Sequence, residues 1–224
     1  MSRSTVIVDV VSDVVCPWCY IGQKRLARAV EAVPDLAVSV RWRPYQLDPT
    51  IPKEGRDRRR YMIDKFGSEE RIAEIHARIE ELGRAEGIDF AFDRIKVAPN
   101  TLDAHRVIRW AGGAGEAVQD ALVRRLFALN FEEGADVGDP EVLASAAGEA
   151  GLDAATVAAM LATDADKAEV EEEIATASRM GISGVPCFIL DAKYALVGAQ
   201  EADVLADALR KVAAERTGSP SVGA

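Results

Sequence analysis

The fold is decided by one continuous stretch, residues 6–34, which reads VIVDVVSDVVCPWCYIGQKRLARAVEAVP. Residues 6–11 are all apolar and β-branched except Asp9, a pattern that predicts a short buried strand. The pair Cys16 and Cys19 follows, and the apolar spacing of residues 20–33 predicts a helix that Pro34 ends. The cysteine pair therefore lies between a strand and the start of a helix.

The position of the two cysteines on this helix gives them different chemistry. Proline is favoured at the first position of a helix, so Pro17 makes Cys16 the N-cap and places Cys19 one turn inside. Unpaired N–H groups and the positive end of the helix dipole favour a negatively charged sulfur at Cys16. Cys19 is close enough to form a disulfide with Cys16 but is less exposed. The motif predicts an attacking thiolate and a resolving thiol, as dithiol exchange requires.

Two other interpretations of the cysteine pair are open. Two cysteines at this spacing also suit half of a tetrahedral zinc site, whose other ligands would come from the scattered Cys187, His76 and His105. The pair could also be two ordinary buried residues, since cysteine is often a small core side chain. The proline and tryptophan between the cysteines and the strand-to-helix junction favour the redox interpretation, with no metal site.

The composition of the chain limits its partners and its compartment. The 224 residues carry 27 Lys and Arg against 37 Asp and Glu, a formal net charge of −10, whereas nucleic acid and anionic membranes attract clustered positive charge. We therefore expect neither as a partner. No apolar run approaches the roughly 18 to 20 residues that span a bilayer, and the first residues lack a secretory signal. The expected location is cytoplasmic, where a close cysteine pair serves chemistry rather than a structural disulfide.

The middle of the chain is helical in its pattern. Residues 55–180 show apolar side chains at helical spacing nearly throughout. Asn100 and Asp139 are expected helix caps, and Gly181 is expected to end the last of these helices. The basic cluster at residues 56–60 is short, and we interpret it as a solvated loop or helix start.

Strand patterns lie on both sides of this helical segment. Residues 38–43 alternate apolar and polar side chains, which predicts a second strand. Residues 187–190 and 194–197 flank a short turn, which predicts a hairpin. A terminal helix is expected after the hairpin. The chain therefore begins as strand, helix, strand and ends as hairpin and helix.

Several further motifs accompany the cysteine pair: SDVVCPWCYIG at 12–22, NTLDAHR at 100–106, FEEG at 131–134, GVP at 184–186 and VGAQ at 197–200. Together with the order of elements they resemble the DsbA family, and within it the FrnE-like branch, over about residues 5–215. The resemblance implies an α/β thioredoxin-like fold with a large all-helical insertion between the second and third strands. It divides the chain into a discontinuous thioredoxin-like domain (1–54 and 181–216), an inserted helical domain (55–180) and a mobile tail (217–224).

The resemblance also implies which residues form the active site. Pro186 matches the cis-proline that thioredoxin-like folds place opposite the cysteine pair, where it leaves the backbone of Val185 free to pair with an extended substrate segment. The catalytic residues are then Cys16, Cys19 and Pro186, and the expected substrate-binding residues are Pro17, Trp18, Val185, Asn100 and His105.

Four assignments near this site have alternatives. Asn100 is either a substrate contact or only a helix cap, and His105 either faces the site or is solvated. Cys187 departs from the apolar residue that commonly follows the cis-proline. It is either a small core residue or a third thiol near the pair. Asp13, three residues before Cys16, is either a proton acceptor for Cys19 or a polar strand end.

Three functions compete on this basis. The first is a thiol–disulfide oxidoreductase or isomerase, with protein or small-molecule thiol and disulfide substrates and a thioredoxin or glutathione system as redox partner. The second is a glutathione-dependent isomerase or transferase, since 2-hydroxychromene-2-carboxylate isomerases and kappa-class glutathione transferases share the inserted-helix architecture. Those sites resemble this one but have serine at the position of Cys16. The third is a holdase-like binder that uses exposed Trp18. No bound cofactor is expected, with glutathione as a cosubstrate or reductant.

Overall fold

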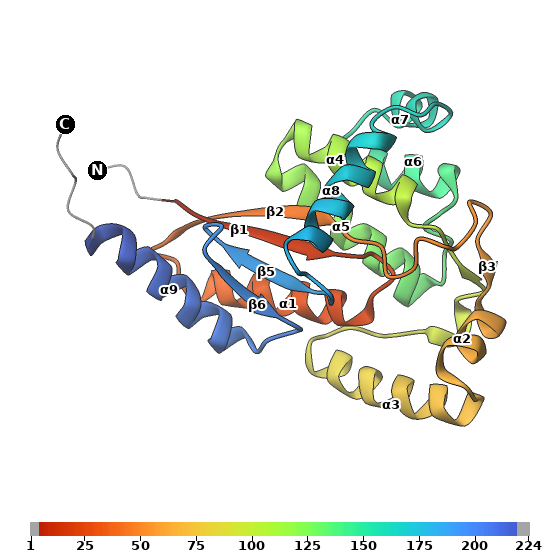
Figure 1. The fold of residues 1–224 in the computed structure, drawn as a ribbon, viewed down its shortest axis with the longest axis horizontal. Coiled ribbons are helices and arrows are strands. Elements are labelled where there is room, and N and C mark those ends of the chain that lie inside the picture. Colours follow the sequence, from red (N-terminus) through yellow and green to blue (C-terminus); the bar gives the residue numbers. More distant parts are fainter. Residues whose placement is uncertain (1–4, 219–224) are drawn as a thin grey trace.

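The computed structural model describes residues 5–218, and its centre is a four-stranded sheet in the order β2-β1-β5-β6 (Figure 1). β1 (Thr5–Ser12) and β2 (Ala37–Pro44) run parallel in one register over all eight residues of each strand. β5 (Cys187–Leu190) runs antiparallel to β1 and pairs with β6 (Tyr194–Val197) in a hairpin. The strands predicted from the sequence are therefore confirmed, including the bounds of the hairpin.

Two helices from opposite ends of the chain lie side by side along this sheet (Figure 1). α1 (Pro17–Glu31) begins directly after the cysteine motif's first residue, with Pro17 at its first position. α9 (Ala202–Gly218) contacts both α1 and β1. The first two residues of the predicted tail therefore belong to α9, and the rest of that tail, 219–224, lies outside the described residues.

Between β2 and β5 the chain forms the predicted helical insertion, which confirms a thioredoxin-like fold interrupted at that point. Its helices are α2 (Arg58–Phe66), α3 (Glu69–Ala85), α4 (Leu102–Ala114), α5 (Glu116–Ala128), α6 (Pro140–Glu149), α7 (Ala154–Leu161), α8 (Lys167–Arg179), the short η1 (Phe92–Arg94) and the π-helical η2 (Leu129–Glu133).

The insertion also contains a small strand pair that the helical pattern did not predict. β3 (Arg56–Asp57) pairs antiparallel with β4 (Val97–Ala98). Ala98 precedes Pro99, and a residue before proline is disfavoured in the helical conformation. This pairing holds the start of α2 against the segment that leads into α4.

The predicted helix ends can now be compared with the structure. Asp139 caps α6 by accepting from the N–H of Glu141, and Gly181 follows α8 with a positive φ of 81°, so both predictions are confirmed. The cap position of α4 is Thr101 rather than Asn100. Asn100 still serves the helix, because its Oδ1 accepts from the N–H of Leu102 at 2.9 Å.

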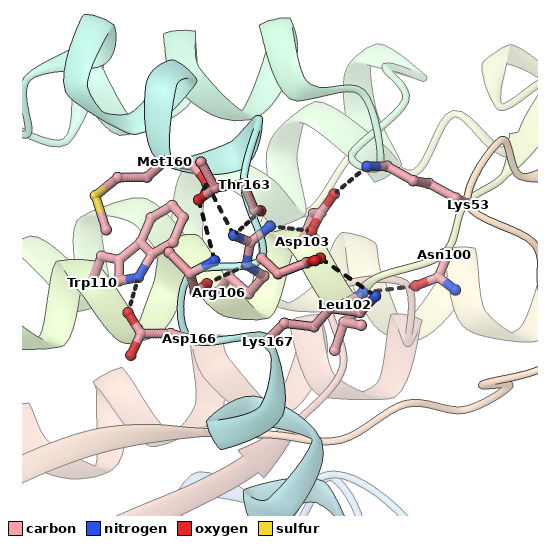
Figure 2. A network of polar contacts seen from close by, with 12 residues as sticks. Lys53, Asn100, Leu102, Asp103, Arg106, Trp110, Met160, Thr163, Asp166 and Lys167 are labelled. Carbon is pink, nitrogen blue, oxygen red and sulfur yellow. Dashed lines mark hydrogen bonds and ion pairs between the residues drawn. The ribbon is translucent and has the colours of Figure 1, made fainter.

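α4 is held in place by the guanidinium of Arg106, which is only 1% exposed (Figure 2). The side chain pairs with Asp103 at 2.8 Å and donates to three carbonyl oxygens at the end of α7 and in the loop after it. A buried charge is tolerated when it is paired and fully hydrogen-bonded in this way. The contacts fix the first turns of α4, the helix that carries His105.

The two predicted domains share one hydrophobic core. The buried valines of β1 and the buried residues of α5, among them Leu122 and Phe127, belong to a single contiguous cluster. Trp42 of β2 lies in it, and Trp110 of α4 packs against it. No helix within residues 5–218 is both long enough and apolar enough to cross a bilayer.

Candidate active site

Cys16 lies at the N-cap of α1, as its place before Pro17 predicted. Its backbone is extended, its N–H donates to the carbonyl oxygen of Asp13 at 3.0 Å, and its own carbonyl oxygen accepts from the N–H of Cys19. Both cysteines are free thiols in the structure. The first turn of α1 therefore places the two sulfurs next to each other at the end of β1.

The two cysteines differ in their surroundings. Both are buried, Cys16 at 3% and Cys19 at 1% exposed, but only Cys16 lines a cavity. Burial raises the pKa of Cys19 well above the ordinary thiol value, and the hydrogen bond and charge of Cys16 raise it further. Cys19 is therefore held as a neutral thiol behind Cys16.

A loop from the far end of the chain covers Cys16. The Val185–Pro186 peptide bond is cis, which confirms the prediction that Pro186 is a cis-proline. Cys16 Sγ donates to the carbonyl oxygen of Val185 at 3.7 Å, across 169 positions of sequence. The N–H of Val185 forms no hydrogen bond within residues 5–218, so it is available to a ligand.

Gly22 allows α1 to approach this loop closely, and sequence reasoning gave it no role. A Cβ at this position would lie 2.9 Å from Pro186 Cγ and 3.1 Å from the ring of Phe188. Glycine is therefore required by packing here, since any side chain would push α1 away from the loop. Two residues earlier, the Tyr20 hydroxyl donates to Glu132 at 2.5 Å, which ties α1 to the insertion.

The cavity at Cys16 has a volume of about 550 Å³, within the range of small-molecule sites. Its wall combines the start of α1, the Val185 loop and two helices of the insertion, α2 and α3. Trp18, 36% exposed as predicted, belongs to this wall. The predicted site residues that line the cavity are Cys16, Pro17, Trp18 and Val185.

His105 and Asn100 lie away from this cavity. His105 is 3% exposed, and its Nε2 lies 2.8 Å from the carbonyl oxygen of Tyr45 and 3.4 Å from Asp13 Oδ1. Asn100 uses both ends of its amide on the protein, where it contacts Gln46, Ile51 and Leu102. These contacts give both residues a structural environment, with His105 behind the cysteine motif.

Asp13 connects His105 to the cysteine motif. Its Oδ2 accepts from the N–H of Leu47 at 2.8 Å. Its Oδ1 is buried and accepts no hydrogen bond within the described residues, apart from the longer approach of His105. Asp13 also lines the cavity. A buried carboxylate oxygen beside a dithiol is suited to accept a proton.

Cys187 is 1% exposed in β5, where it pairs with Val11 and Val197, and it does not line the cavity. Burial raises the pKa of its thiol. These surroundings agree with the interpretation of Cys187 as a small core residue.

Sequence reasoning missed two polar residues of the cavity, Arg58 and His76. The cluster at 56–60 was expected to be a solvated loop or helix start; it contains the start of α2, but Arg58 lines the cavity. One face of α2 lines the cavity, and it is formed by Arg58, Tyr61, Met62, Lys65 and Phe66. The helical spacing of these residues can be seen in the sequence. The sequence does not show that this face of α2 lines the cavity at Cys16, because that depends on the fold.

Comparison with known proteins agrees with the fold. A model of the DsbA-like thioredoxin domain matches residues 7–210. An uncharacterized protein of Bacillus subtilis, YwbO, is 26% identical over 187 residues, which are 83% of this chain and 87% of that protein.

Two solved structures resemble the chain over nearly its whole length. A probable DsbA oxidoreductase of Streptomyces coelicolor is 32% identical, with a TM-score of 0.86 over 98% of this chain and 94% of that one. A 2-hydroxychromene-2-carboxylate isomerase, 18% identical, covers 96% of this chain and 100% of its own with a TM-score of 0.71, a likeness of fold. The chain belongs to the DsbA-like thioredoxin domain family and is an enzyme of its disulfide oxidoreductase class.

Proposed function

We propose that the protein exchanges thiols and disulfides through Cys16 and Cys19, with Cys16 as the nucleophile and Cys19 as the resolving thiol. The observation that carries this proposal is the difference between the two sulfurs. Cys16 stands at a helix N-terminus on a cavity wall, and Cys19 is buried behind it with a raised pKa. A nucleophile must be reached by its substrate, whereas a resolving thiol must stay protonated until it is needed.

The exchange balances as follows. The Cys16 thiolate attacks one sulfur of a substrate disulfide, so that a bond from Cys16 to this sulfur forms and the other substrate sulfur leaves as a thiolate. Cys19 then loses its proton and attacks Cys16 Sγ, which releases the first substrate sulfur and forms the Cys16–Cys19 disulfide. Two electrons pass from the cysteine pair to the substrate, and the reverse sequence oxidises a substrate dithiol.

The Val185 loop and the cavity wall would hold the substrate during this exchange. The unpaired N–H of Val185 can donate to an extended backbone, next to the carbonyl oxygen that already accepts from Cys16. Pro17 and Trp18 supply apolar surface on the other side of Cys16. His105 and Asn100 would act indirectly, through the position of Asp13 and the start of α4.

A second candidate is glutathione-dependent chemistry on a small molecule. The observation that favours it is the cavity itself, whose volume of about 550 Å³ suits a small ligand. Glutathione would then be a cosubstrate, and under the first proposal it would be a reductant or, with thioredoxin, a redox partner. We propose that either function operates in the cytoplasm, because a cytosolic disulfide reductase, DsbM of Pseudomonas aeruginosa, shares the fold of this chain.

The test is the capture of the mixed disulfide. Purified Cys19→Ser protein is incubated with glutathione disulfide, and the intact mass and peptide masses are measured after acid quenching. We expect one glutathionyl group, attached at Cys16, because the resolving thiol is absent. The matched controls are Cys16→Ser, expected to carry no adduct at Cys19, and Cys187→Ser, expected to behave as the parent protein.

Two results would overturn the proposal. An adduct on Cys187 alone would place the reactive thiol elsewhere, and no adduct at Cys16 would exclude it as a nucleophile. In the latter case, suppression of aggregation that survives in a Cys16→Ser/Cys19→Ser protein would favour the holdase-like binder. Isomerase activity that requires glutathione but leaves no adduct would favour the second candidate.

A further inference from the structure

The cavity at Cys16 contains a positive charge that the protein does not neutralise. Arg58 lines it and is partly buried, and its guanidinium forms no hydrogen bond or ion pair within residues 5–218. Burial lowers the pKa of this guanidinium, which shows that its charge is poorly solvated. The neighbour whose charge acts on it is the phenol of Tyr61, a group that is neutral near pH 7.

The acidic residues of the same wall do not pair with Arg58. Asp48 accepts from the N–H and the hydroxyl of Thr50, and Asp13 accepts from the N–H of Leu47. Lys65, on the same face of α2, donates to the Tyr61 hydroxyl at 3.1 Å and its charge acts on Asp48, whereas Arg78 of α3 adds a further positive charge to the wall. In a protein with a net charge of −10, this wall is suited to an anion.

His76 provides a second unpartnered polar group on this wall. Its Nε2 is buried and has no hydrogen-bond partner among the described residues, and its ring stacks on Phe92 with the centroids 4.1 Å apart. Burial, with the charge of Arg58 as a smaller cause, lowers the pKa of His76 to about 4. The imidazole is therefore neutral and fixed in orientation, with one nitrogen available to a ligand.

Most of the remaining wall is apolar. Its apolar side chains come from α2, α3, the loop after β2 and η1, and they include Leu47, Ile51, Met62, Phe66, Ile79 and Phe92. Such a wall binds an apolar body and stabilises a polar one poorly, because polar groups would lose water without gaining partners.

We propose that this cavity binds a small molecule with an apolar body and one carboxylate, with the carboxylate paired to Arg58 and within reach of His76. A guanidinium binds a carboxylate through two parallel hydrogen bonds, and one buried guanidinium balances one negative charge. The apolar body lies along α2 and α3 in the cavity that Cys16 also lines. The proposal concerns binding and does not depend on the dithiol chemistry.

The experiment compares two ligands that differ in charge and have nearly the same shape, 2-naphthoate and 2-naphthamide. Their dissociation constants for the full chain are measured by isothermal titration calorimetry at pH 7.4. We expect 2-naphthoate to bind at least about tenfold more tightly, since it alone forms the charge-assisted pair. Equal affinity for the two ligands, or no binding of either, would overturn the proposal.

Variants then locate the site. Arg58→Gln is expected to bind both ligands with similar affinity, and Arg58→Lys to keep a weaker preference for the carboxylate. The matched control is Arg59→Gln, a neighbour on α2 that pairs with Glu69 outside this cavity and should behave as the parent protein. A preference for 2-naphthoate that survives in Arg58→Gln would contradict the assignment.

Protection of Cys16 gives a readout that does not require a variant. Bound 2-naphthoate should slow the alkylation of Cys16 by iodoacetamide, because both occupy one cavity. Binding without protection would place the ligand elsewhere and overturn the proposal, even if Arg58→Gln does not fold. Failure of the redox chemistry would appear instead in the glutathione adduct described above, which these measurements do not use.

Discussion

At the scale of single residues, Cys16 and Cys19 share one helical turn and are both buried, but only Cys16 lines the cavity. Cys19 is enclosed at the end of β1, so its charged form loses solvation, and the adjacent Cys16 adds to the effect. The difference between the surroundings of the two thiols therefore comes from the packing around the turn as well as from the helix itself.

The raised pKa of Cys19 predicts a pH dependence. The thiolate is the reactive form, so a raised pKa lowers its fraction at any given pH and moves the rise in reactivity to higher pH. In Cys16→Ser, burial remains as the largest cause, and the rate of Cys19 alkylation by iodoacetamide should still be rising at pH 9. An alkylation rate that reaches a plateau below pH 8.5 in the folded Cys16→Ser variant would contradict this. The control is the same variant unfolded in urea.

We expect Asp13 to accept the proton that Cys19 loses when it resolves the mixed disulfide. Its buried Oδ1 has only the 3.4 Å approach of His105 Nε2, and its backbone carbonyl accepts from the N–H of Cys16. Asp13→Asn keeps the shape of the side chain but removes the basic oxygen. We expect the mixed disulfide at Cys16 to form at its normal rate and its resolution by Cys19 to slow by at least about tenfold.

Quenched-flow mixing with glutathione disulfide, with acid as the quench and mass measurement as the readout, separates formation of the mixed disulfide from its resolution. Asp48→Asn is the control, because Asp48 also lines the cavity but is hydrogen-bonded to Thr50. Equal slowing of both steps in Asp13→Asn would indicate a structural effect, and resolution at the normal rate would exclude Asp13 as the acceptor.

At the scale of elements, the distance between α1 and the Pro186 loop is set by Gly22. A methyl group there would lie within 3.1 Å of both Pro186 and Phe188, closer than carbon atoms pack. Gly22→Ala should therefore destabilise the fold by about 1–3 kcal/mol, the usual cost of overpacking, although alanine favours helix over glycine.

Urea unfolding measures this cost, and Gly113→Ala is the matched control. Gly113 is an exposed helical glycine with no atom within 4 Å of its missing Cβ, so its replacement should leave stability unchanged or raise it by up to about 1 kcal/mol. If the two variants were equally stable, the close packing of α1 on the loop would not constrain the fold.

Local sequence patterns predicted the elements well, and the cavity poorly. The β-branched run of β1, the alternation of β2, the proline that begins α1 and the turn between β5 and β6 each depend on neighbouring residues alone. These elements, together with the family motif, predicted the part of the site that surrounds Cys16.

The inward position of Arg58 depends on which face of α2 meets the cysteine motif, about 40 positions away in sequence. A charged residue in a basic cluster is usually solvated, so its type argued against the cavity. The short strand pair β3–β4 is similarly non-local, because it joins residues that no periodicity relates.

At the scale of the whole molecule, the sheet and the insertion share one core and enclose the cavity between them. The buried cluster runs from the valines of β1 through the aromatic rings around Tyr20 to the helices α5 and α6. We expect a single cooperative unfolding transition, with coincident curves from far-ultraviolet circular dichroism and tryptophan fluorescence. Two separated transitions would show that the insertion folds as an independent domain.

The central claim is that Cys16 and Cys19 form one redox centre. The most direct measurement equilibrates the protein in glutathione redox buffers of increasing potential, quenches with acid, traps free thiols and locates them by peptide mass. The account predicts one reversible two-electron transition that involves Cys16 and Cys19 and leaves Cys187 reduced. A pair that stays reduced over the whole range, or a transition that includes Cys187 in place of either partner, would contradict it.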